Sequence, residues 1–266
     1  MIKKICALVL LSFVFVLPAF AFAIDGSIYT AGVSRYLWRG LVLNDGPAIQ
    51  SGVSFASQGA TVGVWTSCQQ MVSPDLFDEI DLTAAYEHSI PYADFLTLGV
   101  GYVSYFTAPY NYPNIVASQE YSVTLKSDII SSPYVTFYHS LDAATTYNYL
   151  EAGLSYEYET GELLGGKTAA GASGSLGFGL NEFDLDAVTL ERTEASKFTA
   201  AGLNLYFNYE IAGFKITPSA FFQLSLNDTK DESGARVYKN MALVSIMANY
   251  DFKMGTEDKT DEKATE

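Results

Sequence analysis

In several segments of this sequence, acidic residues are separated by even numbers of positions. Glu79, Asp81 and Glu87 all have odd residue numbers within one segment, and so do Glu151 and Glu157 within another. Because side chains on a β-strand alternate between its two faces, acids spaced in this way gather on one face. Carboxylates on the inner wall of a pore favour cations over anions. If these segments line a pore, its candidate lining residues are Glu79, Asp81, Glu87, Lys126, Asp128, Glu151, Glu157 and Glu210.

Patterns for catalysis or metal binding are sparse. The two histidines, His88 and His139, are each followed directly by a serine. Neighbouring residues on a strand point to opposite faces, so neither His-Ser pair places a base beside a nucleophile. The sequence contains no HExxH motif, no phosphate-binding loop and no CxxC. We therefore predict no enzyme activity, no catalytic residue, no cofactor and no metal site.

Residues 1–23 have the composition of a secretory signal peptide. Lys3 and Lys4 precede an apolar run, and Ala21-Phe22-Ala23 fits a cleavage site. The sequence thus predicts three parts: a signal peptide over 1–23, a folded domain over 24–253 and an acidic, disordered tail over 254–266. The formal charge of -15 argues against a nucleic-acid partner, because phosphates would repel the chain.

Between these ends, apolar and polar residues alternate over stretches of about ten positions. Leu203, Leu205 and Phe207, for example, alternate with polar residues such as Asn204 and Asn208. This period is that of a half-buried strand and differs from that of a helix. We predict about twelve strands, near 27–38, 47–57, 60–69, 78–88, 95–106, 119–128, 134–142, 148–158, 168–180, 198–211, 214–226 and 240–252.

The connections between these strands fall into two groups. Those after even-numbered strands are mostly short, such as Ser57 to Gly59 and Ala212-Gly213. Those after odd-numbered strands are mostly longer and more polar: 69–77, 107–118, 181–197 and 227–239. Short periplasmic turns and long extracellular loops are typical of barrels in the bacterial outer membrane. Two connections deviate from this pattern, because 142–147 is short and 159–167 is long.

A soluble β-sandwich is the rival fold. Its strands would be shorter, and their polar faces would carry Lys, Glu and Thr. The polar faces here are rich in Gly, Ser and Asn, and the 19 Tyr and 17 Phe suit the aromatic girdles of a lipid-facing band. We therefore predict an all-β protein: a transmembrane, antiparallel, up-and-down β-barrel of about twelve strands in the bacterial outer membrane, with membrane lipid as a partner.

The segment from Ser34 to Ser67 resembles the N-terminal signature of the TorF-type or Gcw family of outer-membrane porins. The matching residues are Tyr36, Trp38, Arg39, Gly40, Pro47, Ala48, Gln50, Gly63, Trp65 and Ser67, and residues 79–87 resemble the next element of that family. The resemblance implies an outer-membrane barrel that acts as a channel for small solutes. From the residues themselves, we expect Trp38 at a membrane interface near the outer end of the first strand, with Arg39 facing the lumen or the loops.

Three functional hypotheses follow from the sequence. The first is a channel for passive diffusion of small hydrophilic solutes, with a modest preference for cations. The second is a non-conducting structural or adhesive barrel, in which the inward acids pair with Lys126, Arg35 and one another while the loop at 107–118 contacts a partner. The third is a lipid-modifying enzyme that uses His88 or His139.

Overall fold

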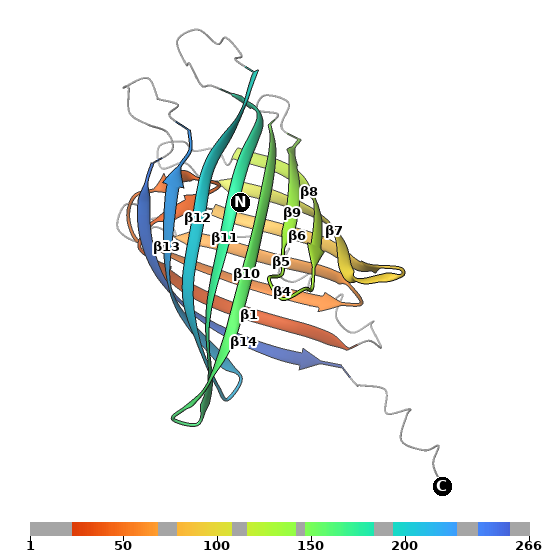
Figure 1. Ribbon diagram of the computed structural model, residues 1–266. Helices are drawn as coiled ribbons and strands as arrows, with labels where there is room; N and C mark the ends of the chain where they lie inside the picture. Colours follow the sequence, from red (N-terminus) through yellow and green to blue (C-terminus); the bar gives the residue numbers. More distant parts are fainter. Residues whose placement is uncertain are drawn as a thin grey trace, which may run out of the picture.

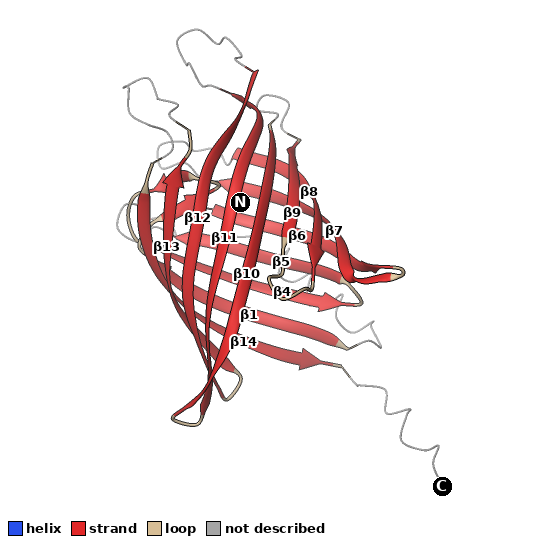
Figure 2. Ribbon diagram, viewed as in Figure 1, coloured by secondary structure: helices blue, strands red, loops and turns tan. Residues whose placement is uncertain are grey.

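Twelve strands close into one antiparallel barrel (Figure 1). The computed structural model describes residues 23–68, 79–107, 116–141, 147–183, 194–227 and 239–255, and these contain strands and turns but no helix (Figure 2). The barrel strands are β1 (Ile24–Val33), β4 (Ala48–Ser57), β5 (Ala60–Cys68), β6 (Glu79–Ile90), β7 (Ala93–Thr107), β8 (Val116–Ser127), β9 (Tyr134–Ser140), β10 (Asn148–Leu163), β11 (Gly166–Phe183), β12 (Glu194–Ile211), β13 (Phe214–Ser225) and β14 (Met241–Met254). In the described residues, no helix is long and apolar enough to cross a membrane.

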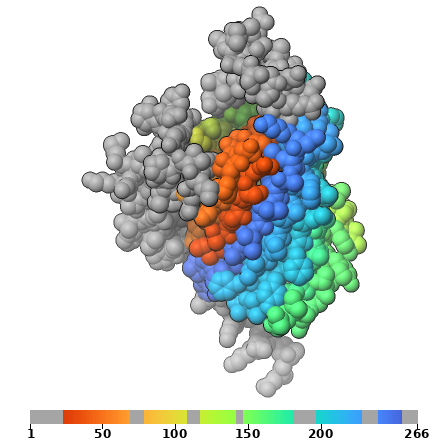
Figure 3. Space-filling model, turned by 90° about the vertical axis from the view of Figure 1, so that its left-hand side faces the viewer, coloured from red at the N-terminus to blue at the C-terminus, as the bar shows by residue number. Residues whose placement is uncertain are grey.

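The first and last strands close the barrel. β1 pairs with β14 along its whole length, from Ile24 opposite Met254 to Val33 opposite Ser245. On its other side β1 pairs with β4, so that no strand of the barrel is left with an unpaired edge. Figure 3 shows the red N-terminal and blue C-terminal strands side by side on the outer surface. Closure gives the backbone N–H and C=O groups of every barrel strand a hydrogen-bond partner, which lipid cannot provide.

Short turns lie together at one end of the barrel. Gln58-Gly59, Leu164-Gly165 and Ala212-Gly213 are two-residue turns in which both residues have positive φ. Such turns match the twist of paired strands, and glycine takes positive φ without steric cost. The expected long connection over 159–167 is therefore wrong, because β10 continues to Leu163 and β11 begins at Gly166. The connection at 142–147 lies outside the described residues except for its last residue.

The distribution of side chains is the reverse of that in a soluble protein. The most deeply buried side chains are polar, including Glu120 at 2% exposure and Thr199 at 0%. Large apolar side chains such as Val100, Leu203 and Ile246 instead lie exposed on the outer face. A closed barrel with this exterior is stable in lipid, which covers the apolar band. The protein is thus a bacterial outer-membrane β-barrel, and the predicted fold class is confirmed.

The segment between β1 and β4 departs from the prediction. β1 ends at Val33, and residues 34–47 form a separate two-stranded hairpin of β2 (Tyr36–Trp38) and β3 (Leu41–Asn44), called the lumen hairpin below. Arg39 and Gly40, with φ of 47° and 91°, reverse the chain at its tip. The expected strand over 27–38 is therefore wrong beyond Val33. Trp38 does not lie at a membrane interface, because this reversal folds it against the inner wall beside Tyr105.

Candidate functional site

The lumen hairpin crosses the interior of the barrel. At its tip, Arg39 reaches Glu120 on β8, while the carbonyl oxygen of Gly40 accepts a hydrogen bond of 2.8 Å from Nε2 of Gln223 on β13. Four strands, β9 to β12, separate β8 from β13 on one side of the ring, and six separate them on the other. The two anchors therefore stand on nearly opposite walls. The hairpin divides the lumen at this level.

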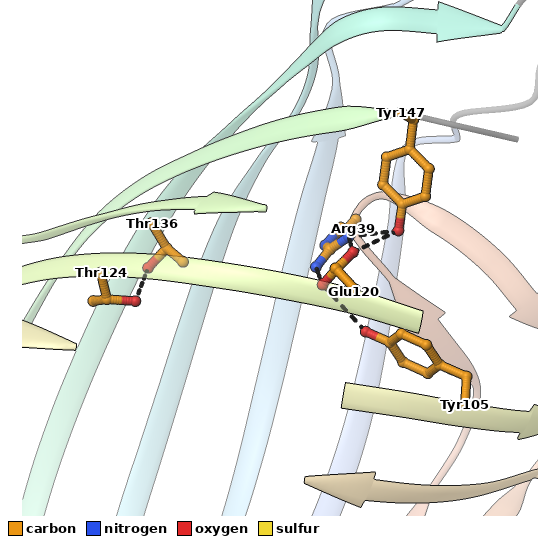
Figure 4. Close-up of polar contacts among 6 residues, drawn as sticks. All are labelled: Arg39, Tyr105, Glu120, Thr124, Thr136 and Tyr147. Atoms are coloured by element: carbon orange, nitrogen blue, oxygen red, sulfur yellow. Dashed lines mark hydrogen bonds and ion pairs between the residues drawn. The ribbon is translucent and has the colours of Figure 1, made fainter. Parts of the chain in front are cut away.

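Arg39 and Glu120 form a buried, bidentate ion pair (Figure 4). Nη1 and Nη2 of Arg39 each donate to one oxygen of the Glu120 carboxylate at 2.6 Å, and the two side chains are 10% and 2% exposed. Tyr147 donates to the same carboxylate at 2.7 Å and also accepts from Nη1, and Tyr105 donates at 3.3 Å. Bidentate charge-assisted hydrogen bonds fix orientation as well as distance. The pair therefore holds the hairpin tip in one position.

Aromatic rings surround the same guanidinium group. The Cζ atom of Arg39 lies 3.9 Å from the ring centre of Tyr138, 4.5 Å from that of Trp38 and 5.1 Å from that of Tyr149. Ring faces attract cations most strongly where water is excluded. Burial by itself lowers the pKa of Arg39, but the hydrogen bond with Glu120 and the negative charge around it raise that pKa above its usual value. Arg39 is thus held as a cation.

The base of the hairpin is anchored on β5 and β6. The ring of Tyr36 packs against that of Trp65 at 5.6 Å between centroids, and its hydroxyl group hydrogen-bonds with Glu79. Burial, and then the negative charge of Glu79, raise the pKa of Tyr36. The hydroxyl group of Tyr36 therefore stays protonated and donates to Glu79.

On the opposite side of the hairpin, the lumen contains a cavity of about 450 Å³. Its outer wall is made by β10 to β14 and its inner wall by the hairpin. The lining side chains from the barrel are mainly small or polar: Glu151, Ser173, Ser175, Gly177, Gly202, Asn204, Ser219, Gln223 and Ser245. A cavity of this size and polarity accommodates a small hydrophilic molecule with its water.

Two glycines let aromatic side chains lie flat against this wall. A Cβ atom added to Gly202 would lie 2.7 Å from Cζ of Phe221, and one added to Gly177 would overlap the hydroxyl group of Tyr149. The absence of a side chain thus lets each ring lie against the backbone of the neighbouring strand. The aromatic side chains of this wall therefore leave the cavity open.

The predicted pore-lining acids lie at different heights in the barrel. Glu79 and Asp81 are buried at the inner wall of β6, and Glu151 lines the cavity, where Tyr134 donates to it at 2.7 Å. Glu157 accepts a 2.7 Å hydrogen bond from Asn208. The other four predicted residues lie nearer the short turns: Glu87 and Lys126 form an exposed ion pair, Glu210 is exposed near the end of β12, and Asp128 lies in the turn after β8.

The residues that hold the hairpin tip were not predicted from the sequence. Glu120 and Lys126 are six positions apart on β8, so their side chains face the same side of the strand. This spacing would have predicted that Glu120 faces the lumen. Tyr105, Tyr138 and Tyr147 carried no signal that separates them from girdle tyrosines. Several signature residues meet around the hairpin: Tyr36, Trp38, Arg39 and Gly40 belong to it, Trp65 packs on it, and Gln50 lines the cavity beside it. Pro47 directly precedes β4, and Ala48 is buried at its start.

Both histidines lie on the outer face. His88 stacks on Tyr86, and His139 stacks on Tyr121; these two tyrosines are 48% and 49% exposed. Nδ1 of His139 lies 2.7 Å from Oδ1 of Asn148. Within the described part of the chain, neither the stacking contacts nor the contact with Asn148 places a histidine beside a serine hydroxyl group, as activation of a serine nucleophile requires.

No protein-family model and no curated protein matches the chain. Among solved structures, the NanC porin is similar with a TM-score of 0.49 and 11% identity, over 84% of this chain and 98% of that one. LpxR from Salmonella typhimurium has a TM-score of 0.46 and 9% identity, over 85% and 99% of the two chains. An outer membrane channel from Pseudomonas putida F1 has a TM-score of 0.44 and 13% identity, over 87% and 96%.

The resemblance of residues 34–67 to the TorF-type or Gcw family stays a prediction. The fold rests on the strand pairing and the apolar exterior of this chain. The chain forms a twelve-stranded outer-membrane β-barrel whose lumen is crossed by an inward-folded hairpin.

Proposed function

We propose that the barrel is a channel for passive diffusion of small hydrophilic solutes. The observation that carries the proposal is the cavity of about 450 Å³ between the lumen hairpin and β10 to β14. Its walls present hydroxyl, amide and carboxylate groups, which replace the water that a polar solute loses on entering a narrow passage. Solutes would pass beside the hairpin, along the wall of β10 to β14.

We further propose a modest preference for cations. Three basic groups at the lumen are paired with acids: Arg39 with Glu120, Lys126 with Glu87, and Arg35 with Asp45 at 2.7 Å. The carboxylates of Glu151 and Glu157, both on β10, add further negative charge to the wall along which solutes would pass. Unbalanced carboxylates in a passage of low dielectric concentrate cations and repel anions.

Planar-bilayer recordings test both statements. Purified full-length protein should produce stepwise conductance, and a KCl gradient should give a reversal potential of the sign expected for cation selectivity. Glu151→Gln should shift that potential toward zero, because Glu151 lines the cavity. Glu162→Gln, which changes an exposed acid close to the turn after β10, serves as the matched control and should leave it unchanged. Absence of conductance steps, or anion selectivity, would contradict the proposal.

The non-conducting barrel is the second candidate, and one observation favours it. The hairpin is fixed to opposite walls by Arg39 and by the carbonyl group of Gly40, which blocks part of the cross-section. This candidate predicts a silent wild-type protein that conducts once the hairpin is released. The adhesive loop proposed at 107–118 lies outside the described residues over 108–115.

A further inference from the structure

We propose that the inner wall of β5 and β6 binds a hard divalent cation, for which Ca²⁺ is the best match, through Glu79, Asp81 and Ser67. Glu79 and Asp81 lie two positions apart on β6 and face the same side, and Ser67 pairs with Glu79 across the β5–β6 ladder. Exposure is 8% for each acid and 1% for the serine. Three buried side chains with oxygen ligands therefore share one patch of wall.

Two oxygen atoms in this patch lack a partner among the described residues. Oδ1 of Asp81 and Oγ of Ser67 are both buried without a hydrogen bond. Buried polar atoms are almost always satisfied by protein, water or an ion, because an unsatisfied one loses its hydration without compensation. Oγ of Ser67 belongs to β5 and Oδ1 of Asp81 belongs to β6, so the two unpaired atoms are independent observations. Both point to a ligand that the described side chains do not supply.

The charge of the patch indicates the sign of that ligand. Glu79 and Asp81 are adjacent on one strand face, where two carboxylates repel each other. Arg39, the buried base at the hairpin tip, is already paired with Glu120. Tyr36 of the lumen hairpin hydrogen-bonds with Glu79 and packs beside Trp65. A bound cation would neutralise both carboxylates and, through Tyr36, stabilise the docked hairpin.

The ligand chemistry selects the kind of cation. Carboxylate and hydroxyl oxygens are hard ligands, which suit Ca²⁺ and Mg²⁺. Mg²⁺ needs nearly ideal octahedral geometry and gives up its water reluctantly, whereas Ca²⁺ tolerates irregular sites and completes its shell with water. Glu79, Asp81 and Ser67 are fixed on a barrel wall and supply only part of a coordination shell. This arrangement suits Ca²⁺ better than Mg²⁺. The inference goes beyond the proposed channel and holds equally for a barrel that does not conduct.

Terbium luminescence tests the site in full-length protein in detergent. Tb³⁺ is a close substitute for Ca²⁺, and the Trp65 ring, on the residue paired with Asp81, would sensitise its emission. We expect saturable Tb³⁺ emission that Ca²⁺ displaces. Asp81→Asn should weaken Tb³⁺ binding by at least about tenfold, because it removes a charged ligand. This variant keeps the shape of the side chain and lowers the buried charge, so it should fold.

Two further variants make the test specific. Ser67→Ala should weaken Tb³⁺ binding less than Asp81→Asn does, because a neutral ligand is lost. Glu157→Gln, which changes an inward acid on β10, should leave Tb³⁺ binding at its wild-type level. The proposal is overturned if the wild type gives no Ca²⁺-displaceable emission, which would mean that the two carboxyl groups share a proton instead. It is equally overturned if Asp81→Asn binds Tb³⁺ as tightly as the wild type. Because no membrane potential enters the measurement, its outcome is independent of conductance.

Discussion

The two sides of the lumen are built in different ways. On the side of β5 to β9, the lumen hairpin packs against the wall through Trp65, Tyr105 and the buried ion pair between Arg39 and Glu120. On the side of β10 to β14, small side chains and glycines border an open cavity. The pair of Arg39 and Glu120 thus fixes the hairpin on one wall, while free volume is kept at the other. One side of the cross-section is therefore filled by the hairpin, and the other side holds an open cavity.

The difference predicts unequal sensitivity to substitution. A buried ion pair becomes strongly destabilising when one partner is removed, because the other charge remains in the interior. A wall of small side chains tolerates loss of any one of them, but it cannot absorb a large ring without losing volume. The packed side should therefore respond to removal of a charge, and the open side to addition of bulk.

The largest effect is expected for Glu120→Gln. Arg39 would remain among aromatic rings without a counter-charge, a situation that costs about 3–5 kcal/mol. The hairpin should then leave its docked position, and conductance should rise with frequent switching between levels. Urea unfolding would measure the loss of stability, and single-channel recording would measure the conductance.

A double variant provides the control for this experiment. Arg39→Met combined with Glu120→Leu removes both charges and retains side-chain volume, so its stability should lie within about 1–2 kcal/mol of wild type. If Glu120→Gln leaves both stability and conductance unchanged, the ion pair does not hold the hairpin.

A smaller effect is expected on the open side. Ser175→Trp would place a ring in the cavity and should reduce the conductance to about half or less, because the passage narrows. Leu176→Trp places the same ring on the outer face, where Leu176 is 39% exposed, and should leave the conductance unchanged. Equal currents from both variants would show that solutes do not pass along β10 to β14.

The smallest effect is expected for the ion pair of Lys126 with Glu87. Its nitrogen and oxygen atoms are 2.6 Å apart, as in the buried pair, but the side chains are 39% and 46% exposed. Exposed pairs contribute about 0–1 kcal/mol. Lys126→Met should therefore shift the urea midpoint only slightly. A loss as large as that in Glu120→Gln would show that burial is not what distinguishes the two pairs.

The strands were predictable because alternation is a local property of the chain, as in residues 203–211. The hairpin was not, because Tyr36 to Trp38 continue the alternation of β1 without a break. The Arg39-Gly40 dipeptide resembles Gln58-Gly59, which also forms a two-residue turn, and it would have served as a signal. The inward direction of Glu79 and Asp81 was predictable from their spacing of two positions alone. The role of Glu120 depends on a partner 81 residues away, which no local pattern contains.

The sequence separation of these anchors also has a consequence for how the protein assembles. The hairpin belongs to the first part of the barrel to be synthesised, but its anchors lie 81 and 183 residues further along the chain. Contacts between distant residues form late, because long loops must first be ordered. Docking therefore has to wait until β8 and β13 stand in a closed ring. The fluorescence of Trp38, which packs beside Arg39, would report completion of the barrel.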